Sequence, residues 1–148
     1  MVTAVYADTS AVVAAYLADE PGHGELRELL LSGRCRVLTS ELTRVEFASA
    51  MTAAKRAGRI PDGRRFLDQF DEDVRSGLLG MIPLVPPRIL PAARRLVTEN
   101  HPLRTLDAIH LAVALHDTVG LTGGEPVVMI TRDQRQADAA KAHGLEVG

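Results

Sequence analysis

The sequence predicts an α/β domain in three layers, with a central parallel sheet of four to five strands and helices on both faces. Short apolar runs alternate along the chain with longer helical patterns, an order typical of right-handed crossovers between parallel strands. The runs are apolar throughout rather than alternating, as in strands that are buried on both sides. The length of 148 residues favours a single domain over 1–148.

The elements follow from local patterns. Apolar runs predict strands at 3–7, 36–39, 79–85, 127–131 and, more briefly, 145–147. Helical patterns occupy 10–18, 24–31, 41–57, 89–99, 106–119 and 134–142. A further helix is expected to begin at Pro61, because the proline ring fixes φ near the helical value. In that helix Phe66, Leu67, Phe70 and Val74 are spaced to line one face.

Composition excludes several classes of protein. A hydrophobic fraction of 46% and a net charge of −2 are unlike those of a disordered chain, and the single cysteine, Cys35, excludes a disulfide scaffold. The longest apolar run, 11–18, is far shorter than the ~20 residues that span a bilayer, and the first residues lack the pattern of a signal peptide. A soluble, cytoplasmic protein without membrane contact is therefore expected. Aromatic residues make up only 3%, which disfavours a base-stacking platform.

Two aspartates follow predicted strands. Asp8 ends the first strand and Asp133 follows the fourth. Ligands of doubly wound sheets bind beyond the carboxyl ends of the strands, so both acids are candidates for chemistry. Each is equally well placed to cap the next helix.

Two further acids lie within predicted helices. Glu46 has apolar neighbours and lies nearly two turns into its helix if that helix begins at Ser40; a capping box with Thr43 is the alternative. Asp107 follows Thr105 closely, so it could simply complement the helix dipole in the first turn.

Together the four acids indicate more than each does singly. Converging carboxylates repel by ~4 kcal/mol per close pair at an effective dielectric of 20, and a divalent cation would offset that charge. An all-oxygen ligand set suits Mg²⁺ or Mn²⁺ rather than zinc, which indicates hydrolysis of phosphodiesters or phosphomonoesters. The five histidines show no metal-ligand spacing, and His110 could simply be a residue on a helix face.

Several short motifs occur in order along nearly the whole chain. They are 5–11 (VYADTSA), 20–22 (EPG), 39–46 (TSELTRVE), 106–112 (LDAIHLA), 131–135 (TRDQR) and 139–140 (AA). With these motifs the chain resembles a PIN-domain ribonuclease, specifically the VapC-type toxin of a bacterial type II toxin–antitoxin pair. No single motif is specific, but the ordered set is.

The resemblance implies a metal-dependent endoribonuclease with a Rossmann-like fold. Asp8, Glu46 and Asp107 match the characteristic acids and Asp133 the more variable fourth, for which Asp117, Glu125 and Asp138 are possible substitutes. Asp8 and Asp107 would be direct Mg²⁺ ligands, with Mn²⁺ as a substitute, whereas Glu46 would hold water or a second ion. The small hydroxyl residues expected beside the metal are Thr9, Ser10 and Thr131.

The resemblance also implies partners. They are an RNA substrate, a second copy of the chain, and a small VapB-like antitoxin that binds DNA and blocks the active site. Four arginines could guide the RNA backbone or simply form a solvated surface: Arg56, Arg59, Arg64 and Arg65. The face around Phe66, Phe70 and Val74 is either ordinary core or the groove for the antitoxin, with core favoured for Phe66.

Other functions are less consistent with the residues. A haloacid-dehalogenase-type phosphatase needs a second aspartate where Ser10 stands, and both that enzyme and a phospho-accepting receiver domain need a late lysine that Lys55 and Lys141 do not supply. A PIN-like module that binds RNA or a partner without cleavage remains open. Four mutually repelling acids argue against it, because a module without catalysis has no need to keep them.

Overall fold

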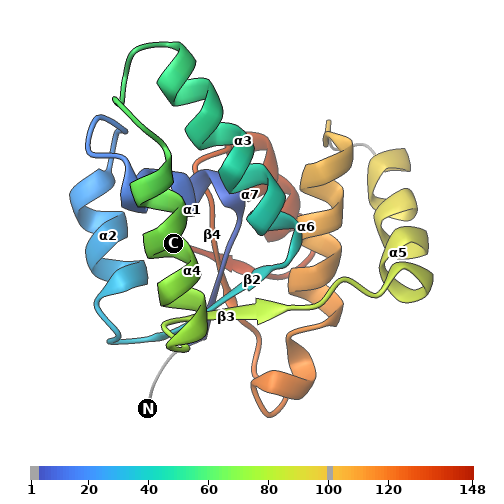
Figure 1. Ribbon diagram of the computed structural model, residues 1–148. Helices are drawn as coiled ribbons and strands as arrows, with labels where there is room; N and C mark the ends of the chain where they lie inside the picture. The colour runs from blue at the N-terminus through green and yellow to red at the C-terminus, as the bar shows by residue number, and fades with distance from the viewer. Residues whose placement is uncertain (1–3, 100–101) are drawn as a thin grey trace.

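The computed structural model describes residues 4–99 and 102–148 (Figure 1), so the start of the first predicted strand lies outside the described residues. The described strands form one five-stranded sheet in the order β3-β2-β1-β4-β5, and every pair is parallel. The strands are β1 (Ala4–Ala7), β2 (Arg36–Ser40), β3 (Leu79–Ile82), β4 (Val128–Ile130) and β5 (Glu146–Val147). The predicted α/β domain with a parallel sheet is confirmed.

Helices connect every pair of consecutive strands, and a single helix, α7, connects β4 to β5. They are α1 (Thr9–Tyr16), α2 (His23–Leu31), α3 (Leu42–Arg56), α4 (Arg64–Arg75), α5 (Pro86–Thr98), α6 (Thr105–His116) and α7 (Gln134–Ala142), with a 3₁₀ turn at Val119–Leu121. None of the helices in the described residues is long and apolar enough to cross a membrane.

Several element boundaries differ from the predicted ones. Helix α4 begins at Arg64 rather than at Pro61, because the Asp62 side chain accepts a hydrogen bond from the Arg64 backbone N–H (3.1 Å) in the turn before the helix. Strand β3 ends at Ile82 rather than at residue 85. Pro83 follows it and has no N–H for a sheet hydrogen bond.

The core consists of two layers, one on each face of the sheet. Along β1, Val5 and Ala7 pack into one layer with α1, α2, α3 and α4, whereas Tyr6 packs into the other with α5, α6 and α7. This alternation is the two-residue period of a strand. Figure 1 shows α1, α2 and α4 on one side of the molecule and α5 and α6 on the other. The predicted three layers are therefore confirmed.

The centre of the sheet positions the candidate site. Chain connections run outward from β1 to β2 on one side and return to β4 on the other, so the strand order reverses at β1. The backbone N–H of Asp8 donates to the carbonyl of Ile130 at 3.1 Å, which aligns the ends of the two strands. A ligand crevice is expected at such a reversal.

Candidate active site

A cleft of about 490 Å³ lies beyond the carboxyl ends of β1 and β4, and all four predicted acids line it. Asp8 follows β1, Asp133 precedes α7, Glu46 lies in α3 and Asp107 lies in the first turn of α6. Thr9, Ser10 and His110 also line it. The structure thus brings together residues from four separate segments, as the sequence predicted.

Asp8 is buried at the floor of this cleft, with 2% of its surface exposed. Its Oδ1 accepts hydrogen bonds from the Ser10 hydroxyl (2.6 Å) and the Ala11 backbone N–H (3.2 Å), and its Oδ2 accepts one from Thr131. The bond from Ala11 makes Asp8 the N-cap of α1. Asp8 therefore both caps α1 and lines the cleft. Three of about four acceptor positions of the carboxylate are used, which leaves one on Oδ2.

Glu46 is half-buried in the same cleft, and both of its hydrogen bonds are made through one oxygen. Its Oε1 lies 2.6 Å from the Thr9 hydroxyl and 2.6 Å from Nε2 of His110. The capping-box alternative is wrong, because Glu41 is the N-cap of α3 and Thr43 is buried inside the helix. Glu46 is therefore held by tertiary contacts to α1 and α6.

Asp107 and Asp133 complete the acidic wall. The N-cap of α6 is Arg104 rather than Thr105, which places Asp107 in the first turn. Asp133 caps α7, since its Oδ1 accepts from the backbone N–H groups of Arg135 (2.9 Å) and Gln136 (3.3 Å). Only its other oxygen is available to a ligand.

The surroundings of the cleft shift the pKa values of its acids in different directions. Burial raises the pKa of Asp8, and the hydrogen bonds from Ser10 and Thr131 offset this only in part. Burial also raises the pKa of Asp107, and the nearby charges of Asp133 and Asp8 raise it further. For Glu46 burial acts in the same direction, but hydrogen bonds from His110 and Thr9 outweigh it and lower the pKa. Of these three acids, Glu46 is thus the one whose pKa the site lowers.

The donor set fits a hydrated magnesium ion better than a tightly chelated one. Within residues 4–99 and 102–148, no three His, Cys, Asp or Glu side chains are grouped closely enough to hold an ion directly. The carboxylates nevertheless face one cleft and repel one another. Magnesium keeps several of its waters and is commonly bound by only one or two carboxylates. Asp8 and Asp107 are the residues that would hold it.

The proposed substitutes for the fourth acid lie elsewhere. Asp117 ends α6 at the end opposite Asp107 and pairs with Arg88 at 2.7 Å. Asp138 accepts from Gln134 on the exposed side of α7, and Glu125 is exposed in the turn before β4. None of the three lines the cleft.

The four arginines expected to guide RNA do not line the cleft either. Arg59 pairs with Asp19 (2.8 Å) and Glu20 (2.7 Å), which braces the α1–α2 turn. Arg56 is exposed near the end of α3 and Arg64 and Arg65 are exposed at the start of α4. Contact of these residues with RNA stays a prediction.

Phe70 belongs to the core, where it stacks on Phe47 with ring centroids 4.7 Å apart. Phe66 and Val74 are partly buried against the same layer. Phe66 also lines a separate hollow of about 330 Å³ with Ile60 and Pro61. The core interpretation therefore holds for Phe70, whereas Phe66 contributes to both core and surface.

Polar residues at the site to which the sequence analysis gave no functional role include His110, Arg104, Arg132 and Gln136. His110 is 1% exposed and contacts Glu46, so it is more than a helix-face residue. Gln136, fully buried, donates to the Asp107 carbonyl at 2.9 Å. Their spacing in the sequence could have identified them, because they lie one or three positions from Asp107 or Asp133. Residues three positions apart in a helix lie on the same face.

Comparison with known proteins identifies the family of the chain. The PIN domain family model matches residues 5–142. The chain belongs to the PIN domain family. It is also 35% identical to Ribonuclease VapC46 of Mycobacterium tuberculosis over 144 residues, which are 97% of this chain and 95% of that protein. The resemblance to VapC-type PIN domains is therefore confirmed.

Solved structures share the fold of this PIN domain. The crystal structure of PAE2754 from Pyrobaculum aerophilum superposes with a TM-score of 0.63 at 18% identity, covering 99% of this chain and 83% of the other. A toxin–antitoxin complex from Klebsiella pneumoniae gives a TM-score of 0.51 at 20% identity, covering 89% and 88%. At these identities the likeness concerns the fold alone.

Proposed function

We propose that this PIN domain is a metal-dependent endoribonuclease that acts as the toxin of a type II toxin–antitoxin pair. The observation that carries the proposal is the cleft at the reversal of strand order, where Asp8, Glu46, Asp107 and Asp133 meet. Its similarity to a protein named as a VapC ribonuclease supports the reaction class. Burial and the nearby charges of Asp133 and Asp8 raise the pKa of Asp107, which supports a bound cation that would offset this charge.

Each acid of the cleft would have its own role in the proposed reaction. When bound, a divalent cation would lower the pKa of water and offset charge on the scissile phosphate. Asp8, fixed by its three hydrogen bonds, and Asp107, fixed in the first turn of α6, would hold that cation. Glu46 would orient the attacking water through its second oxygen, and Asp133 would act through the oxygen that does not cap α7.

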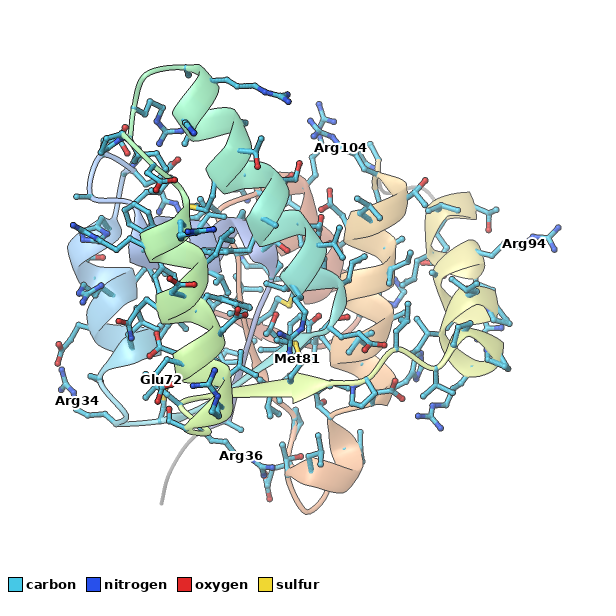
Figure 2. All side chains as sticks on the ribbon, viewed as in Figure 1. Arg34, Arg36, Glu72, Met81, Arg94 and Arg104 are labelled. Carbon is cyan, nitrogen blue, oxygen red and sulfur yellow. The ribbon has the colours of Figure 1, made fainter. Side chains whose placement is uncertain are left out.

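Two arginines on the cleft wall are the best candidates for RNA contacts. Arg104 and Arg132 line the cleft, and no ion pair involves either of them in the described residues. A β-carbon on Gly22 would lie only 3.0 Å from the Arg132 guanidinium, so that group rests on the glycine. Figure 2 shows Arg104 beyond the upper end of α6, on the side toward α3. Guanidinium groups bind phosphates bidentately.

Partners follow from the same proposal. A toxin of this class would form a homodimer and be held inactive by a small VapB-like antitoxin. The fold likeness to a protein solved as a toxin–antitoxin complex supports an antitoxin partner. Size-exclusion chromatography with light scattering measures the dimer directly, and a monomer at all accessible concentrations would contradict it.

Cleavage of total cellular RNA by the purified protein tests the reaction. Discrete fragments are expected with Mg²⁺ or Mn²⁺, and they should disappear with EDTA and in Asp8→Asn. Asp68→Asn is a matched control, since Asp68 is exposed on α4 outside the cleft, and it should cleave normally. Absence of both cleavage and Mn²⁺ binding would instead favour a non-catalytic module that binds RNA or a partner.

A further inference from the structure

A buried hydrogen-bonded chain runs behind Glu46, from β1 through α6 to the cleft. Tyr6 of β1 is 0% exposed and His110 of α6 is 1% exposed. The Tyr6 hydroxyl lies 2.7 Å from Nδ1 of His110, and Nε2 of His110 lies 2.6 Å from Oε1 of Glu46. Residues of three different elements therefore form one chain that ends on a site carboxylate.

The direction of the protons in this chain follows from the donors available. The phenol of Tyr6 carries its proton at neutral pH, as phenols ordinarily do. Within the described residues, the one hydrogen-bond partner of this phenol is Nδ1 of His110. The phenol proton must then go to Nδ1 of His110, the acceptor 2.7 Å away. A neutral imidazole that accepts at Nδ1 carries its own proton on Nε2.

The proton on Nε2 determines how Glu46 is held. Nε2–H donates to Oε1 of Glu46, which also accepts from the Thr9 hydroxyl at 2.6 Å. In the described residues no hydrogen bond reaches the other oxygen, Oε2, and the Glu46 side chain retains 23% exposure on the cleft wall. One oxygen is thus saturated by the protein and the other remains for a ligand.

We propose that Tyr6 fixes His110 as the Nε2–H tautomer, and that His110 is a positioning residue that clamps Oε1 of Glu46 so that Oε2 alone serves the cleft. The assignment of this tautomer depends only on the buried contacts of His110 with Tyr6 and Glu46. What Oε2 binds, a metal ion or the attacking water, rests on the proposed function. The partner of a carboxylate or histidine near a metal fixes its orientation and basicity in the same way.

The spacing of Asp107 and His110 makes the clamp part of the same helix face. They are three residues apart on α6, so the turn that presents Asp107 to the cleft also places His110 beneath Glu46. Tyr6 points to the α6 side of the sheet because side chains alternate along β1. A change of the clamp should therefore affect Glu46 without moving the backbone of either element.

Nitrogen-15 NMR of the metal-free protein at mildly alkaline pH tests the tautomer without any assay of activity. The ring nitrogens of His110, assigned by their loss in His110→Gln, are expected to report the Nε2–H form. Tyr6→Phe removes the phenol proton and should shift His110 to a mixture of tautomers. Tyr16→Phe is the matched control, since Tyr16 also donates to a buried acid, Asp73, but outside the cleft, and it should leave His110 unchanged.

A wild-type protein with the Nδ1–H form or a doubly protonated ring would overturn the proposal, as would a Tyr6→Phe spectrum identical to that of the wild type. These results are independent of cleavage. A chain with the expected tautomer that neither cuts RNA nor binds Mn²⁺ would contradict the proposed function and leave the clamp in place.

A second pair of variants tests the positioning role. Glutamine at 110 places an N–H donor near the position of Nε2, whereas leucine has similar bulk and no donor. His110→Leu is expected to weaken Mn²⁺ binding and cleavage by roughly tenfold or more, and His110→Gln should recover most of both. Circular dichroism and thermal melts confirm that both variants fold. Equal losses in the two folded variants would show that packing alone matters and would overturn the clamp.

Discussion

Asp8 combines two roles, because a single carboxylate both caps α1 and lines the cleft. Asparagine is an equally good N-cap, so Asp8→Asn should keep the helix while it removes a buried charge. We expect cleavage to be abolished and the melting temperature of the metal-free protein to stay unchanged or to rise. Calorimetry in EDTA measures this. A fall of many degrees would mean that the charge itself stabilises the fold.

The raised pKa of Asp8 gives that prediction a pH dependence. An acid whose pKa is raised in the folded state contributes stability at low pH that is lost as pH rises through the folded value. Wild type and Asp8→Asn should therefore be similarly stable well below pH ~4, and the variant should gain an advantage as the pH approaches neutrality. Denaturant unfolding in EDTA across this range checks the sign. An advantage confined to acid pH would contradict it.

At the scale of elements, the turn between α1 and α2 depends on one glycine. Gly22 has φ +77°, and a β-carbon there would meet the Arg132 guanidinium at 3.0 Å. Gly22→Ala is expected to cost about 1–2 kcal/mol of stability, because of the left-handed backbone, and to displace Arg132. Gly24→Ala is the matched control: it has no contact within 4 Å and lies in α2, so it should be neutral or stabilising by up to about 1 kcal/mol.

Urea unfolding of the two glycine variants measures the difference. Gly22→Ala should also weaken RNA binding if Arg132 contacts phosphate. Equal stabilities of the two variants would show that the turn tolerates a side chain and that Arg132 simply moves aside.

At the scale of the whole molecule, the distribution of charge matters more than the net of −2. The cleft is lined by five acids, with Arg104 and Arg132 as its arginines, so binding of the proposed RNA substrate there would depend on a few cationic contacts. Replacement of Arg104 or Arg132 by alanine should reduce the slope of log affinity against log salt by ~1 each. Arg94 is the control, since it points away from the sheet on the outer side of α5 (Figure 2).

Fluorescence anisotropy with labelled tRNA and a non-cleaving Asp8→Asn background measures this slope. Arg64→Ala and Arg65→Ala, at the start of α4, belong in the same series. A larger change in slope for those variants than for the cleft pair would place the RNA track over α3 and α4 instead.

Features that depend on neighbours along the chain were determined by the sequence itself. Continuous apolar runs predicted a parallel sheet, and acids that directly follow strands predicted where the cleft would form. Asp8 and Asp133 were recognisable as helix caps for the same reason, since a cap bonds to backbone groups two or three residues on. Errors occurred at boundaries such as the start of α4, where a side chain in the turn competes with the helical preference of Pro61.

Only the tertiary structure decided which buried polar groups are partners. Tyr6 and His110 are 104 residues apart, and His110 and Glu46 are 64 apart, so no local pattern marks them as a pair. An apolar stretch predicts that a residue is buried, but the cost of burying a polar group is offset only by a partner from another element. The sequence by itself therefore determined the fold and the acids of the cleft. The three-dimensional packing determined that Glu46 is clamped through one oxygen and that Arg132 rests on Gly22.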